Sequence, residues 1–129
     1  WESEAGANLL LSIYLRPYKL EAQHQFRLNV AVALAVSDFA RLYVGEGIRL
    51  KWPNDLFYHD QKLGGILIEN TIQGSFIADS VVGVGININQ THFWGAFVAT
   101  SFSIITGRFY NLHELLDQLF RFFELRLSA

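Results

Sequence analysis

The chain has 129 residues, of which 51% are hydrophobic and 17% charged, and its formal net charge at pH 7 is −2. A chain of this length buries about two-thirds of its unfolded surface, which is enough for one hydrophobic core. The near-neutral charge argues against electrostatic binding to nucleic acid or to a membrane surface, which calls for a basic excess. Because the sequence has no cysteine, it excludes disulfide scaffolds, thiolate metal sites and a cysteine nucleophile.

Two further features of the sequence concern localisation and completeness. The longest strongly apolar run, residues 30–36, is far shorter than the ~20 residues that span a bilayer. No basic segment followed by an apolar one opens the chain, so we expect a cytoplasmic protein that does not associate with membranes. The chain starts at Trp1 and contains no methionine, so we expect it to be a piece of a larger protein.

The first third of the chain predicts a strand followed by a long helix. Residues 8–15 are a short apolar run that stops before Arg16 and Pro17, which is typical of a buried strand. Residues 26–44 carry apolar side chains near helical spacing and are followed by Gly45-Glu46-Gly47, which favours one helix packed on a sheet. Its valines lower the helix propensity, so burial must stabilise this helix.

Strand-like segments then follow one another without an intervening helix. They are residues 48–52, 56–58, 62–71 and 75–89, with turn residues at 59–61 and 73–74. Such a succession favours an antiparallel or mixed meander.

The last third predicts helices that cover the sheet. We expect a loop at residues 92–97, a short helix at 100–106 and an amphipathic helix at 111–127. Asn111, with Glu114 three residues later, is close to a capping box at the start of the last helix. The predicted fold is a single α+β domain over residues 1–129, in which helices cover a mixed, largely antiparallel sheet.

A first candidate site lies in Lys51-Trp52-Pro53-Asn54-Asp55. This segment places a cation, an aromatic ring, an amide and a carboxylate within five residues at a strand end, where ligands gather in layered α/β domains. The Asn54 amide suits a purine edge, and the Asp55 carboxylate is an oxygen ligand for a divalent cation. The alternative is a strand that simply ends in a Pro-Asn-Asp turn.

A second candidate site is Lys62-Leu63-Gly64-Gly65. Adjacent glycines weaken a strand, and either a bulge or the close approach of a ligand accounts for them. Lys62 directly precedes this opening and is placed to reach a carboxylate or a phosphate. The alternative is a bulged strand with a solvated lysine.

A third candidate site lies in residues 82–89. Gly83, Gly85 and Asn87 share one face of the predicted strand, because side chains alternate with a period of two. The opposite face consists of apolar side chains that suit a core, namely Val82, Val84, Ile86 and Ile88. The glycine face predicts a floor for a flat ligand, and the lack of a following helix pattern disfavours a dinucleotide-binding Rossmann site.

Together these motifs resemble the catalytic domain of biotin protein ligases. The resemblance rests on Lys-Trp-Pro-Asn-Asp at 51–55, Lys-Leu-Gly-Gly-Ile-Leu-Ile-Glu at 62–69 and Val-Gly-Val-Gly-Ile-Asn-Ile-Asn at 82–89, in this order and spacing. The opening Trp-x-Ser-x-x-Gly-x-Asn-Leu at 1–9, followed by Ser12, resembles the stretch after the arginine- and glycine-rich biotin loop of that family. The resemblance implies the class II synthetase-like fold of the biotin and lipoate ligases.

The resemblance also implies a two-step, ATP-dependent biotinylation of a protein. The carboxylate of biotin attacks the α-phosphate of ATP to give biotinyl-5′-adenylate, and a lysine of a biotin carboxyl carrier protein then accepts the biotin. Because two anions must meet, cationic side chains and Mg²⁺ are expected to offset their repulsion.

The same resemblance assigns roles to single residues. Lys62 matches the catalytic lysine that contacts the carboxylate and the α-phosphate, and Asp55 matches the catalytic acidic residue that helps to place Mg²⁺. The remaining matched positions are expected to bind biotin or the nucleotide: Trp1, Lys51, Trp52, Asn54, Gly64, Gly65, Gly83, Gly85 and Asn87.

Parts of the family pattern lie outside this sequence. They are the arginine–glycine loop, the strand before it and the small C-terminal β-barrel domain, so we expect the isolated 129 residues not to form biotinyl-adenylate at a normal rate. Two alternatives stay open: a lipoate or octanoate ligase or transferase of the same fold, and a non-catalytic remnant that retains the sheet floor.

Overall fold

The computed structural model describes residues 3–17, 19–51, 54–95 and 98–127. Its sheet has five strands in the order β1-β5-β4-β3-β2, and each neighbouring pair is antiparallel. The strands are β1 (Leu9–Leu15), β2 (Ile48–Lys51), β3 (Asp55–Tyr58), β4 (Gln61–Gln73) and β5 (Phe76–Ile86). The helices are a short 3-10 turn η1 (Ala22–His24), α1 (Gln25–Val44), α2 (Phe102–Thr106) and α3 (Leu112–Leu127).

These elements confirm the α+β fold and the order of elements predicted from the sequence. The expected mixed sheet is antiparallel between its named strands, and its parallel contribution among the described residues is one isolated bridge between Lys62 and Ala99. None of the helices in the described part of the chain has the length and apolar character needed to cross a membrane.

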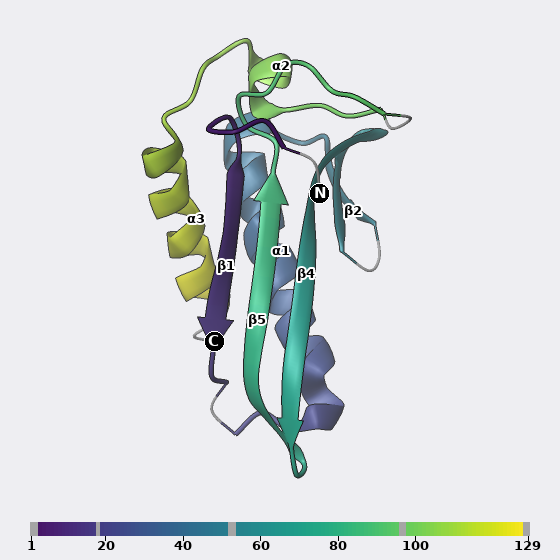
Figure 1. The fold of residues 1–129 in the computed structure, drawn as a ribbon, viewed down its shortest axis with the longest axis vertical. Helices are drawn as coiled ribbons and strands as arrows, with labels where there is room; N and C mark the ends of the chain where they lie inside the picture. The colour runs from purple at the N-terminus through teal and green to yellow at the C-terminus, as the bar shows by residue number, and fades with distance from the viewer. Residues whose placement is uncertain (1–2, 18, 52–53, 96–97, 128–129) are drawn as a thin grey trace.

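The helices pack against one face of the sheet. In Figure 1 the strands β1, β5 and β4 face the viewer, α1 lies behind them and α3 runs beside β1. The core between these layers includes fully or almost fully buried side chains from α1, β5 and α3: Val32, Val36, Phe39, Val82, Val84, Ile86, Leu115 and Leu119. The alternation in β5 therefore confirms the predicted core face, which leaves the glycines on the opposite face.

Helix α1 depends on this burial, as its valine content predicts. Seven of its twenty residues are buried, and it ends where Gly45 adopts a φ of 80°. Gly45 donates its backbone N–H to the carbonyl of Arg41 and so completes the last turn.

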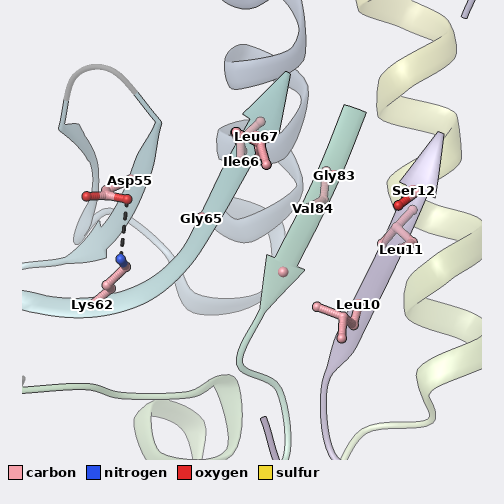
Figure 2. Close-up of a pocket in the computed structure, with 11 residues that line it drawn as sticks. Leu10, Leu11, Ser12, Asp55, Lys62, Gly65, Ile66, Leu67, Gly83 and Val84 are labelled. Carbon is pink, nitrogen blue, oxygen red and sulfur yellow. Dashed lines mark ion pairs between the residues drawn. The ribbon is translucent and has the colours of Figure 1, made fainter. Parts of the chain in front are cut away.

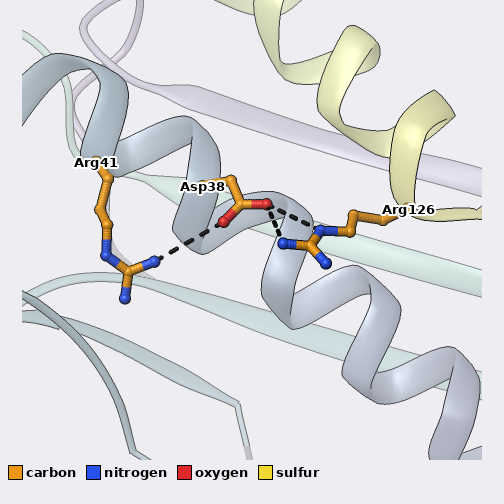
Figure 3. Close-up of polar contacts among 3 residues, drawn as sticks. All are labelled: Asp38, Arg41 and Arg126. Carbon is orange, nitrogen blue, oxygen red and sulfur yellow. Dashed lines mark hydrogen bonds and ion pairs between the residues drawn. The ribbon is translucent and has the colours of Figure 1, made fainter.

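Helices α1 and α3 are also joined at the surface. Asp38 of α1 accepts two hydrogen bonds at Oδ2 from Arg126 of α3, at 2.7 Å from Nη2 and 2.9 Å from Nε (Figure 3). The other oxygen of the same carboxylate lies 3.8 Å from Nη1 of Arg41. Because these side chains are partly exposed, the cluster links α3 to α1 but contributes little to the stability of the fold.

The connection from β5 to α3 closes the end of the core. Ser101 caps α2, since its hydroxyl accepts a hydrogen bond from the Ile104 N–H at 3.2 Å. The fully buried ring of Phe102 stacks on Tyr43 at a centroid distance of 5.7 Å. Asn111 then caps α3 by accepting hydrogen bonds from the backbone N–H groups of His113 and Glu114 at 3.0 and 3.2 Å, as its sequence position predicts.

Candidate functional site

The predicted glycine floor exists, and the strand register shows how it is built. In one row across four strands, Leu10 of β1 faces Gly85 of β5, Gly85 faces Gly65 of β4, and Gly65 faces Asp55 of β3. Adjacent strands lie ~4.8 Å apart, so roughly 14 Å separates the two strands that carry the side chains of this row. The two glycines between them leave the sheet bare on the face away from the helices.

A hollow of about 430 Å³ lies over this bare region (Figure 2). It is lined by Leu10, Leu11, Ser12, Asp55, Lys62, Gly65, Ile66, Leu67, Gly83, Val84 and Gly85. This volume falls within the ~300–1,000 Å³ of typical small-molecule sites. Figure 2 shows the leucines and Ser12 around one part of the hollow and the charged side chains at another.

The charged end of the hollow is an ion pair between neighbouring strands. The Lys62 ammonium of β4 lies 3.3 Å from Oδ1 of Asp55 of β3. Their side chains remain 30% and 45% exposed, so both groups stay accessible to a ligand. The hollow therefore combines an apolar floor with a cation and a carboxylate at its rim.

A β-bulge aims Lys62 at this hollow. The β3–β4 register passes from the pair Leu56–Gly64 to the pair Phe57–Lys62, so Leu63 is an extra residue on β4. Leu63 is fully buried in the core, while Lys62 lines the same hollow as Gly65. In a regular strand, Lys62 and Gly65 would lie on opposite faces because side chains alternate. The extra residue of the bulge shifts this alternation, so that both lie on the face of the hollow.

Gly64 of the motif at 62–69 and Gly83 of the motif at 82–89 lack a side chain for different structural reasons. A Cβ at Gly64 would lie 2.4 Å from the Gly85 carbonyl oxygen, so β4 and β5 approach too closely there for any side chain. A Cβ at Gly83 would meet its nearest atom, the Leu67 carbonyl oxygen, at 3.6 Å, which is an ordinary contact. Packing thus explains Gly64, whereas the missing side chain at Gly83 keeps the hollow open.

Lys51 is the register partner of Asp55 across β2 and β3, although neither Lys51 nor Asn54 is among the residues that line the hollow. The Lys51 ammonium lies 4.0 Å from the centroid of the Phe57 ring, a cation–π contact. Asn54 accepts a hydrogen bond from the Ile66 N–H at its carbonyl and, with Lys51, lines a second crevice of about 270 Å³ that is shared with α1.

The prediction that Asn87 shares the glycine face of the strand is wrong, because β5 ends at Ile86 and Asn87 is buried in the protein. The residue is only 4% exposed, and its Nδ2 donates to the Thr100 carbonyl at 3.1 Å. The lining of the hollow includes Gly65, Gly83 and Gly85 but neither Asn87 nor Gly64. Trp1 and Trp52, which the resemblance places at the ligand, lie outside the described residues.

Sequence reasoning assigned no site role to three side chains that line the hollow, although Ser12 is named with the opening motif. Leu10, Ser12 and Leu67 line it because they face Gly85 and Gly83 across the sheet. Their signal is the pairing register, which the alternation within a single strand does not provide.

Comparison with known proteins agrees with the motifs. Residues 1–87 match the Biotin/lipoate A/B protein ligase family. The bifunctional ligase/repressor BirA of Salmonella typhimurium is 39% identical over 88 residues, which are 68% of this chain and 27% of that protein. The biotin–[acetyl-CoA-carboxylase] ligase of Paracoccus denitrificans is 36% identical over 90 residues, which are 68% of this chain and 37% of that protein.

The fold has solved counterparts as well. The biotin protein ligase from Aquifex aeolicus in complex with biotin and ATP aligns with a TM-score of 0.77 and 26% identity, covering 95% of this chain and 50% of that one. The chain thus spans about half of this solved structure and a smaller part of the curated relatives it matches. On the family match and the common fold, the chain belongs to the biotin/lipoate A/B protein ligase family.

Proposed function

We propose that this chain is part of an ATP-dependent biotin ligase, which forms biotinyl-5′-adenylate and transfers biotin to a lysine of a biotin carboxyl carrier protein in the cytoplasm. The observation that carries the proposal is the Lys62–Asp55 pair at the rim of a glycine-floored apolar hollow. This arrangement suits a carboxylic acid with an apolar body, whose carboxylate meets the ammonium while its body lies on the bare sheet.

The first step joins two anions, and Lys62 is the group that makes this favourable. An oxygen of the biotin carboxylate attacks the α-phosphorus of ATP, and the bond from that phosphorus to the bridging oxygen breaks, so pyrophosphate leaves. The Lys62 ammonium at the rim stabilises the charge that both anions bring and that develops on the α-phosphate. Catalysis here is positioning and electrostatics, with no bond between enzyme and substrate.

Asp55 has the chemistry to help hold Mg²⁺ beside the phosphates. Mg²⁺ in nucleotide sites usually takes one or two protein carboxylates together with phosphate oxygens and water. The Asp55 carboxylate is 45% exposed at the edge of the hollow, so it fits such a role. In the described ranges, no three His, Asp and Glu side chains gather as a metal site, so substrate oxygens would complete the coordination. When bound, Mg²⁺ offsets phosphate charge.

In the second step, the amine of the carrier lysine attacks the acyl carbon of the adenylate, and AMP leaves. The hollow lies on the sheet face opposite α1, so an acceptor lysine reaches it without displacing a helix. The further contacts with biotin or nucleotide that we propose rest on the motifs and concern Trp1, Lys51, Trp52, Asn54, Gly64, Gly65, Gly83, Gly85 and Asn87.

The test uses the full-length protein with ATP, Mg²⁺ and a biotin carboxyl carrier domain, supplied with either biotin or lipoate. We expect the carrier to gain the mass of one biotinyl group, and no lipoyl group, in mass spectrometry. Lipoyl transfer would favour the lipoate alternative. No modification, together with no heat of binding for either acid or for ATP in calorimetry, would favour a non-catalytic remnant.

A further inference from the structure

We propose that residues 98–100, held in place by Asn87, position Lys62 for adenylate formation. The inference rests on the proposed function, because it concerns the lysine to which that function assigns the chemistry. It makes Asn87 a positioning residue that acts through the backbone, whatever contact it also makes with a nucleotide.

The segment 98–100 pairs directly with Lys62. The Lys62 backbone N–H donates to the Val98 carbonyl at 2.9 Å, and the Lys62 carbonyl accepts from the Thr100 N–H at 3.0 Å. These two bonds form the isolated parallel bridge between Lys62 and Ala99. Both backbone groups of Lys62 are therefore fixed by a segment that lies more than thirty residues away in the sequence.

Asn87 ties this segment to the sheet and to α2. Its Nδ2 donates to the Thr100 carbonyl at 3.1 Å, and its backbone N–H donates to the Leu63 carbonyl at 2.8 Å. Its own carbonyl accepts from the Phe102 N–H at 3.2 Å. One residue that is 4% exposed thus links β4, the segment 98–100 and the start of α2.

These bonds meet at the bulge that aims Lys62. A bulge leaves backbone groups without their regular ladder partners, and buried backbone groups need replacements. At the extra residue Leu63, the bond from the Asn87 N–H continues the register in which Gly64 of β4 faces Ile86 of β5. Next to it, residues 98–100 supply a donor and an acceptor to Lys62. The direction of the Lys62 side chain, and with it the 3.3 Å contact to Asp55, thus depends on this junction.

Loss of the Asn87 amide should loosen the junction. Thr100 is fully buried, so its carbonyl would lose its side-chain donor with no solvent to replace it. The segment 98–100 would then open more often, and Lys62 would spend less time in the aligned position. The expected consequence is faster amide exchange at Lys62 and Thr100 and a slower chemical step.

The first experiment measures amide hydrogen exchange in the full-length protein. We expect Asn87→Ala to accelerate exchange at the Lys62 and Thr100 N–H groups about tenfold, in line with the loss of one buried hydrogen bond. Asn89→Ala is the matched control, since Asn89 makes equally local amide contacts, to Tyr110 and Ser103, away from Lys62. Equal protection of Lys62 and Thr100 in wild type and Asn87→Ala would overturn the inference. Asn87→Leu, which keeps a similar side-chain volume and removes the donor without burying a charge, replaces Asn87→Ala if the latter does not fold.

The second experiment separates positioning from substrate contact through ATP–pyrophosphate exchange. We expect kcat to fall about tenfold in the Asn87 variant, because a misplaced Lys62 affects the chemical step. An unchanged kcat, with or without a raised KM for ATP, would overturn the positioning role. If the wild-type protein makes no adenylate, the proposed function fails, and hydrogen exchange alone decides whether Asn87 holds Lys62.

Discussion

The Lys62 ammonium lies 3.3 Å from the Asp55 carboxylate because Leu63, the residue after Lys62, is an extra residue in β4. The bulge sends Leu63 into the core and turns Lys62 toward the bare face of the sheet. Two adjacent residues thus perform opposite tasks, one in packing and one in the candidate site. Substitutions can therefore test the chemical role of Lys62 separately from the packing and ligand-binding roles of the neighbouring glycines.

Replacing Lys62 should remove activity while the fold survives. In the full-length protein, we expect Lys62→Ala to slow biotin-dependent ATP–pyrophosphate exchange by ~10²–10³-fold, the usual effect of losing one group that stabilises transition-state charge. Its partly exposed ion pair with Asp55 should contribute no more than ~1 kcal/mol to the free energy of unfolding. Arg49→Ala, which removes an exposed cation on β2, is the control for net charge. Normal adenylate formation by Lys62→Ala would show that Lys62 has another role.

Removing Asp38 tests how much its contacts with Arg41 and Arg126 contribute to stability. We expect Asp38→Ala to lower the free energy of unfolding by ~0.5–1 kcal/mol, because its partners are partly exposed arginines. A double-mutant cycle with Arg126→Ala, followed by urea denaturation, measures the coupling, which should shrink at high salt. Coupling that is absent at low salt would contradict the contact in Figure 3.

Tyr43 should make the fold sensitive to alkali. Burial, and to a smaller extent the charge of Glu114, raises the pKa of the Tyr43 phenol above its ordinary value of 10.0. The unfolded chain therefore loses the phenol proton at a lower pH than the folded chain. The contribution of this proton to the free energy of unfolding is fully present below pH 10 and is lost as the pH rises through the pKa of the folded state.

The measurement for Tyr43 is urea denaturation on both sides of its ordinary pKa. We expect Tyr43→Phe to lose less stability than the wild-type protein when the pH is raised past 10.0. The two proteins should have similar stability near neutral pH, because the phenylalanine ring retains the stacking on Phe102. Parallel loss of stability in both proteins would refute this contribution of Tyr43.

Much of the fold was predictable because the patterns were local. The helix expected at residues 26–44 is α1 (Gln25–Val44), and the strand expected at 8–15 is β1 (Leu9–Leu15). The core face of β5 followed from alternation alone. These predictions need only the neighbours of each residue in the sequence.

The site was predictable only in part, because its walls depend on pairing between distant strands. Leu10 lines the hollow since it faces Gly85, and no pattern within β1 distinguishes it from any other surface leucine. Alternation also places Asn54 and Asp55, which are adjacent, on different sides, and only Asp55 lines the hollow. The pairing of residues 98–100 with Lys62 is a long-range contact without any local signal.

Filling the floor of the hollow should block ligand binding at little cost in stability. A Cβ at Gly83 meets its nearest atom at 3.6 Å, so the sheet accepts a side chain there, and valine also favours strands. The added isopropyl group projects into the space over Gly83 that lines the hollow. We expect Gly83→Val to raise the Kd for biotin by at least ~10²-fold in calorimetry, because the isopropyl group would clash with a ligand that otherwise contacts the bare strand. Unchanged biotin affinity would show that the ligand does not lie on this face.

Gly64 provides the contrasting case, because its neighbour is backbone. A Cβ at Gly64 would lie 2.4 Å from the Gly85 carbonyl oxygen, and relieving that contact requires β4 and β5 to separate beside the bulge. We therefore expect even Gly64→Ala to lower the free energy of unfolding by ~1–3 kcal/mol, whereas Gly83→Ala should change it by less than ~1 kcal/mol. Urea denaturation of both alanine variants measures the difference. Equal stability of the two variants would contradict the explanation that strand packing excludes a side chain at Gly64 and that the sheet tolerates one at Gly83.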